Sequence, residues 1–124
     1  MLSNEGQAST IKKLLDPASL ANTAAATSAY ISMAGAEGDL VVIVSVGAIT
    51  GSFTPTFEHA SDSGGTGSVA IVPNEGAIGA MTANTVVKRT IRKDAIQGFL
   101  RIVGTIATGP TIGACSVAHR LKNF

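Results

Sequence analysis

Short apolar stretches separated by Gly, Ser, Asp and Pro make up most of this sequence, and they restrict the folds that are open to it. Stretches of this kind, rich in Val, Ile, Thr and Phe, are typical of β-strands, and no long run with helical spacing lies between them. The sequence therefore predicts an all-β fold, a single antiparallel β-sandwich or jelly-roll-like domain, and it excludes βαβ units. The expected strands cover residues 27–33, 39–49, 52–59, 68–72, 81–92, 98–107 and 112–121.

Two of these stretches also predict which side chains face the core. Residues 40–46 are almost continuously apolar, which is typical of a strand that is covered on both faces. Residues 99–106 instead alternate, and successive side chains of a strand point to opposite faces of its sheet. We expect one alternate set to face the core, namely Leu100, Ile102, Gly104 and Ile106.

The beginning of the chain has a different pattern. Ile11, Leu14 and Leu15 lie at helical spacing until an Asp-Pro pair, so at most one short helical turn is expected there. Few large apolar residues follow before the first expected strand. We therefore predict an extended N-terminal arm over residues 1–24 and a β-sandwich domain over residues 25–124; a frayed terminus is the other interpretation of the first segment.

Composition limits the function classes. The formal net charge is +1, so bulk charge does not predict a partner such as nucleic acid or a membrane surface. Charged residues make up only 14% of the 124 residues, whereas free soluble proteins usually carry about a quarter, which favours a protein that works in an assembly. The longest apolar run, residues 40–44, is far shorter than the roughly 18 residues of a transmembrane helix, and no signal peptide is expected.

Few residues are suited to catalysis or metal binding. Cys115 is the only cysteine, and in a strand it would lie about 13 Å from His119, too far for a catalytic pair. His59 lies in a polar segment that a surface loop explains, and residues 64–67 lack the Gly-Lys-Ser/Thr ending of a phosphate-binding loop. We therefore predict no catalytic residue, no cofactor and no metal site, and hence no enzyme.

One dense group of charges interrupts this charge-poor sequence. Lys88, Arg89, Arg92 and Lys93 fall within six residues, without the interleaved aromatic side chains that stack on nucleic-acid bases. A solvated strand end, an acidic protein partner and a nucleic acid are the alternatives. We expect these four residues to be electrostatic anchors that set the register of docking to a protein.

The segment 98–112, with the sequence GFLRIVGTIATGPTI, resembles the penultimate hairpin of the capsid cement proteins of tailed phages, the family typified by a Bordetella phage protein. An aromatic or Leu residue, a Leu-Arg pair, an apolar pair, a Thr/Gly turn and a last apolar strand recur there. The resemblance extends over roughly residues 25–121. The chain departs from the family in its short length, in the basic group at 88–93 and in the basic tail formed by His119, Arg120 and Lys122.

The resemblance implies a structural protein without a reaction. It implies a usually oligomeric subunit, for this chain a homodimer or homotrimer, that lies on the outer capsid surface of the virion and clamps neighbouring subunits of the major capsid protein. The protein would be made in the host bacterial cytoplasm and would need no nucleic acid, membrane or cofactor. Its edge strands and termini are expected to dock across subunit boundaries.

Docking contacts are expected from the apolar arm, the basic group and the C-terminus. The candidates are Ile11, Leu14, Leu15, Leu20, Lys88, Arg89, Arg92, Lys93, Leu121 and Phe124. The alternative function is a virion fibre or carbohydrate-binding β-sandwich module. Such modules use exposed Trp or Tyr rings for sugar stacking, and this chain has no Trp and a single Tyr, Tyr30.

Overall fold

The computed structural model describes residues 9–108 and 110–121 of the chain. Within them, the only helical segment is the 3-10 turn η1 (Lys93–Ala95), so the all-β prediction is confirmed. Each of the seven predicted stretches contains a strand, although in 27–33 only Ile31–Ser32 is one. The eight strands of this part are β1 (Ser9–Leu20), β2 (Ile31–Ser32), β3 (Ala36–Ile49), β4 (Phe53–Ala60), β5 (Val69–Ile71), β6 (Thr85–Arg92), β7 (Phe99–Ile106) and β8 (Thr111–Leu121).

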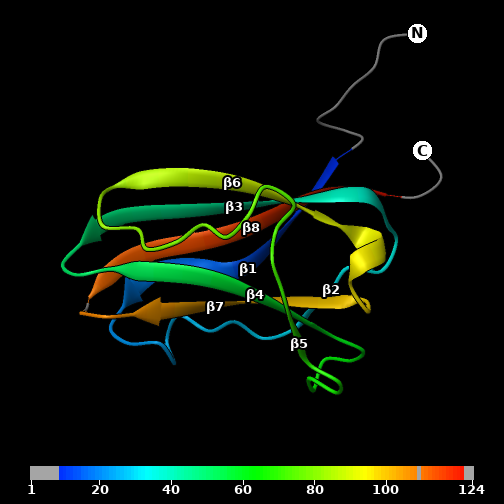
Figure 1. The fold of residues 1–124 in the computed structure, drawn as a ribbon, viewed down its shortest axis with the longest axis horizontal. Coiled ribbons are helices and arrows are strands. Elements are labelled where there is room, and N and C mark those ends of the chain that lie inside the picture. Colours follow the sequence, from blue (N-terminus) through cyan, green and yellow to red (C-terminus); the bar gives the residue numbers. More distant parts are fainter. Residues whose placement is uncertain (1–8, 109, 122–124) are drawn as a thin grey trace, which may run out of the picture.

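The strands form two antiparallel four-stranded sheets (Figure 1). We call them sheet A, with the order β1-β8-β3-β6, and sheet B, with the order β2-β7-β4-β5. The pairs β1/β8, β2/β7, β3/β6 and β4/β5 are nested, as if one long hairpin were folded over on itself. This nesting is the topology of a jelly roll, the more specific of the two expected architectures.

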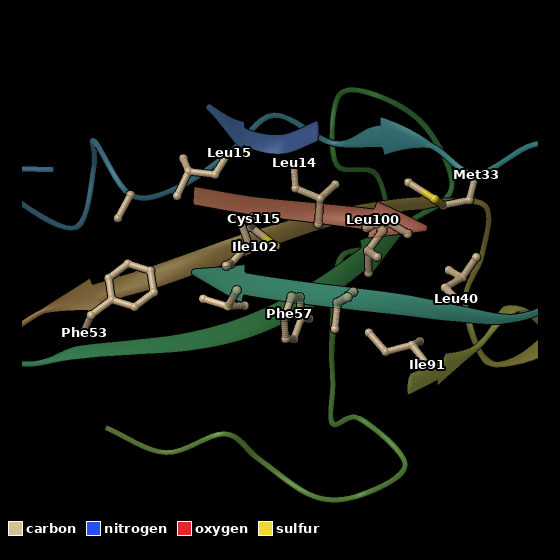
Figure 2. Packing of buried hydrophobic residues seen from close by; sticks show 14 of the residues in the cluster. Leu14, Leu15, Met33, Leu40, Phe53, Phe57, Ile91, Leu100, Ile102 and Cys115 are labelled. Carbon is tan, nitrogen blue, oxygen red and sulfur yellow. The ribbon is translucent and has the colours of Figure 1, made fainter. Parts of the chain in front are cut away.

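The core fills the space between the two sheets (Figure 2). Leu40 and its alternate neighbours on β3 are buried, and they face Phe53 and Phe57 of β4. On β7, Leu100, Ile102 and Gly104 are buried and Ile106 is half-buried, so the predicted core set of this strand is confirmed.

Two sequence-based expectations about strand packing are corrected. Strand β3 is covered on one face only, because in a two-sheet sandwich the other face lies outward; Val41 and Ile43 are half-buried there. The segment 98–112 is not a hairpin within one sheet. Its β7 part pairs with β2 and β4 in sheet B, whereas its β8 part pairs with β1 and β3 in sheet A.

The structure also corrects the arm predicted over residues 1–24. From Ser9 to Leu20 the chain is strand β1, which pairs with β8 along its length. Register shifts between Lys13 and Leu15 and between Leu15 and Ala18 indicate β-bulges, which insert extra residues into one strand. The bulges break the two-residue alternation and explain why this strand imitates helical spacing. Residues 1–8 lie outside the described residues.

Candidate docking surface

The outer face of sheet A carries mostly small and apolar side chains, with charged ones toward its edge strands. Strand register places them in rows across the sheet, and one row runs from Ile11 on β1 through Ala118 and Val41 to Thr90 on β6. The next row runs from Lys13 through Ser116 and Ile43 to Lys88. The following row contains Ala114, Ser45 and Val86. The face therefore carries its apolar side chains across all four strands.

Several large apolar side chains on this face are strongly exposed. Ile11 is 69% exposed, Val86 62% and Ile112 49%, and they belong to β1, β6 and β8. Between them, Val41 and Ile43 of β3 are half-buried among the small side chains of β8. Large apolar side chains exposed on several strands of one sheet face make this face the candidate site of interaction.

Charged groups lie along the borders of the face. On the β1 side, Lys13 pairs with Asp16 at 3.0 Å. On the β6 side, Lys88 and Arg92 point outward, Asp39 is the cross-strand neighbour of Arg92, and Arg92 lies 3.8 Å from Asp94. Opposite charges therefore accompany the cations, and exposed pairs of this kind contribute little to stability. The border can orient a partner, while the centre supplies apolar contact.

The free edges of sheet A are partly blocked. Thr90 of β6 donates its backbone N–H to Oε1 of Glu75 at 2.8 Å, and the N–H of Asn74 donates to the Thr90 carbonyl at 2.8 Å. On the other edge, the bulges and Pro17 of β1 interrupt a regular ladder. The predicted docking by edge strands is therefore less well supported than docking by the open face.

The structure brings together three of the predicted docking residues. Ile11, Lys88 and Arg92 lie on the outer face of sheet A. Arg89 is on the inner side of β6 and donates from Nη1 to the Lys88 carbonyl at 2.9 Å, while Lys93 is half-buried in η1. Phe124 and the side chain of Leu121 lie outside the described part of the chain.

Leu14, Leu15 and Leu20 are corrected as docking residues, because they are buried in the core. They come closest to solvent in a shallow hollow of about 450 Å³ between β1 and the segment that leads into β2. In contrast, Val86 and Ile112 belong to the exposed face and were missed by the sequence analysis. Alternation separates them from Ile91 on β6 and from Cys115 and Val117 on β8, but the sequence does not say which of the two sets faces the core.

Other groups in the described residues form closed structural clusters. Arg101 donates from Nε to Oε1 of Glu58 at 2.8 Å and lies 4.6 Å from the centre of the Tyr30 ring. The Tyr30 hydroxyl is hydrogen-bonded to Ser68, and a Cβ on Gly65 would lie 2.9 Å from Cε2 of the ring. Tyr30 is only 9% exposed, so its ring is not available as a platform for sugar stacking.

Residues suited to chemistry are dispersed or buried. In residues 9–108 and 110–121, no group of three His, Cys, Asp or Glu side chains is placed to hold a metal ion. Burial raises the pKa of the Cys115 thiol to about 12, so it is a poor nucleophile at neutral pH. His119 is also buried on β8. No helix of the described segments is long and apolar enough to cross a membrane.

Comparisons of the chain with protein-family models, with curated proteins and with solved structures find no match.

Proposed function

We propose that this chain is a structural capsid cement protein, which binds the outer surface of a tailed-phage head and stabilises contacts between major capsid protein subunits. The observation that carries the proposal is the exposed apolar outer face of sheet A. Ile11, Val86 and Ile112 project from three of its strands with about half or more of their surface in solvent. Moving a fully exposed side chain of this size into a fully buried site is worth about 1.5–3 kcal/mol, so covering these partly exposed side chains contributes a part of that.

The shape and charge of the chain support a static binding role. An open sheet face can lie across the boundary between two subunits, and the low charge of the chain suits a protein that remains assembled. Each contact can be modest, since a lattice offers many copies and a cement protein that bridges several subunits binds at high effective concentration. Homodimers or homotrimers on the head would increase this effect. The protein would act in the virion, without a reaction or a cofactor.

Binding to capsids tests the proposal directly. Purified protein is sedimented with expanded, undecorated heads assembled from the major capsid protein of the genome that encodes this chain. We expect saturable binding at a fixed ratio to the capsid subunit and a higher temperature of head disruption. Absence of binding to such heads would overturn the proposal.

Two exposed valines provide a matched pair for mapping the surface. Val86 lies on the outer face of sheet A and is 62% exposed, whereas Val69 lies on β5 of sheet B and is 54% exposed. We expect Val86→Asp to weaken head binding at least tenfold and Val69→Asp to leave it nearly unchanged. Equal effects of the two substitutions would exclude sheet A as the docking face.

The basic residues can be tested in the same way. Lys88 borders the face, whereas Lys93 lies in η1 and is half-buried. Lys88→Gln is expected to weaken binding and to reduce its dependence on salt, because salt screens exposed charges. Lys93→Gln removes the same charge away from the face and serves as the control. An identical salt dependence of both variants and the wild type would argue against electrostatic anchoring by Lys88.

A further inference from the structure

The imidazole of His59 connects three segments at one end of the sandwich. His59 lies near the end of β4, and its Nδ1 accepts a hydrogen bond from the backbone N–H of Gln97 at 3.2 Å. Gln97 lies between η1 and β7, and its Nε2 donates to the carbonyl of Gly67 at 2.9 Å. Gly67 belongs to the loop between β4 and β5. The end of β4, η1 and the start of β7 lie at the same end of the molecule (Figure 1).

The hydrogen bond from Gln97 defines the protonation state of the ring. A backbone N–H can only donate, so Nδ1 of His59 must carry a free electron pair and its proton must be on Nε2. The Gln97 side chain contributes a second contact, since its Nε2 lies 3.2 Å from the same Nδ1. An imidazolium has a proton on both nitrogens and could accept neither contact.

The loop at this joint is built to pack closely. Gly67 has φ +68°, and a Cβ at this position would lie 3.3 Å from Oε1 of Gln97. The rest of the loop is held together by its own hydrogen bonds, since the N–H of Ser61 donates to the Thr66 carbonyl at 3.0 Å and the N–H of Thr66 donates to Asp62 at 3.1 Å. The loop is also held by the Tyr30 hydroxyl, which is hydrogen-bonded to Ser68, so the contact that can change at this joint is the one between Gln97 and Gly67.

We propose that His59 is a proton-sensitive latch, which holds Gln97 against Gly67 of the β4–β5 loop when its Nδ1 is free and releases Gln97 when Nδ1 is protonated. Protonation places an N–H of the ring opposite the N–H of Gln97. Two donors then face each other, and the side chain of Gln97 loses the partner that orients it toward Gly67. The three residues in contact, His59, Gln97 and Gly67, are none of the residues that form the outer face of sheet A.

The charged groups around His59 have other partners. On β4, Glu58 is bound by Arg101 of β7, and in the loop Asp62 accepts hydrogen bonds from Gly64 and Thr66. The turn η1 contributes Lys93 and Asp94, of which Asp94 pairs with Arg92. Strand β5 consists of uncharged residues. Of these groups, the imidazole of His59 is the one that contacts Gln97 directly.

Nuclear magnetic resonance of the full chain tests the latch. Long-range ¹H–¹⁵N spectra distinguish the imidazole tautomers, and the only other histidine, His119, is an internal reference. At about pH 8 we expect His59 to carry its proton on Nε2, with a protected Gln97 amide. At about pH 5 we expect at least a tenfold loss of the Gln97 protection factor. The Phe53 amide, which donates to the Met81 carbonyl at 2.9 Å, should keep its protection and so report that the fold is intact.

Two substitutions separate the latch from general effects of acid. In His59→Asn, the amide oxygen can replace Nδ1 as the acceptor, so the Gln97 amide should be protected at both pH values. In His59→Leu, the acceptor is lost, so protection should be low at both. A proton on Nδ1 of His59 at about pH 8, or equal protection of Gln97 at both pH values in the wild type, would overturn the proposal.

Discussion

The ring of Phe53 lies directly against the backbone of Gly104. A Cβ on Gly104 would be 2.5 Å from Cε2 of this ring and 3.0 Å from the Cβ of Ala26. Phe53 is fully buried, so its ring cannot turn toward solvent to make room for a Cβ without leaving the core. The glycine in this β7 position therefore allows the two sheets to approach each other.

We expect Gly104→Ala to destabilise the protein by roughly 1–3 kcal/mol, as is typical for overpacking of a core. Urea unfolding followed by circular dichroism would measure the loss. Gly47→Ala is the matched control, because a Cβ there would lie 3.5 Å from Ile112, an ordinary contact. It should be neutral or stabilise the strand by about 0.5–1 kcal/mol. Equal stability of both variants would contradict the close packing at Gly104.

Leu15 and Ile11 lie on the same strand, β1, but one belongs to the core and the other to the surface. Leu15 is buried, whereas Ile11 is 69% exposed on the outer face of sheet A. Leu15→Ala is expected to cost about 2–5 kcal/mol in unfolding free energy, the usual range for a large-to-small change in a core. Ile11→Ala should change it by no more than about 0.5 kcal/mol. Comparable losses in chemical denaturation would show that β1 does not pack as described.

The strands that sequence analysis predicted best are those with an undisturbed alternation. In β7 every second residue from Leu100 to Gly104 is buried, because no bulge interrupts the strand. In β1 the bulges bring the adjacent Leu14 and Leu15 both into the core, and no two-residue pattern could reveal this strand. Local patterns thus predicted most strands but not the edge strand that completes sheet A.

The candidate surface could be predicted only in part. Ile11 and Lys88 were named from the sequence, but their position on one face depends on β8, which lies between β1 and β3. That pairing joins the two ends of the chain, as in Ile11 and Ala118, and local sequence patterns carry no signal for it. Val86 and Ile112 look like core residues in the sequence, since the side on which the second sheet lies decides whether they are buried.

Glu75 should make the edge of sheet A sensitive to acid. The hydroxyl and the backbone N–H of Thr90 donate to its carboxylate and lower its pKa below the usual 4.5. Its contribution to stability is therefore present above about pH 4.5 and is lost as the pH falls through the lower pKa of the folded protein. Hydrogen exchange of the Thr90 amide at several pH values would measure this.

The variant Glu75→Gln keeps an oxygen acceptor but has no charge. We expect it to protect the Thr90 amide less than the wild type does at neutral pH, because hydrogen bonds to charged acceptors are stronger. The difference between the two proteins should disappear in acid, when the carboxylate is protonated. If the two proteins differed in Thr90 protection at every pH, the effect would come from the geometry of the side chain at position 75 and not from its charge.

Cys115 should make the core sensitive to alkali. Burial raises the pKa of its thiol from 9.0 to about 12, so the folded protein keeps a proton that the unfolded chain loses. The stabilising effect of this proton is fully present below pH 9.0 and decreases as the pH rises from 9.0 toward about 12. Urea midpoints of the wild type should therefore fall more between neutral pH and about pH 10 than those of Cys115→Ala, which lacks the thiol.

Alkylation provides a second measurement, because the native thiol should react with iodoacetamide at least a hundredfold more slowly than the thiol of the urea-unfolded chain. Parallel alkaline profiles of the two proteins, together with rapid native alkylation, would mean that the thiol is not enclosed between the sheets.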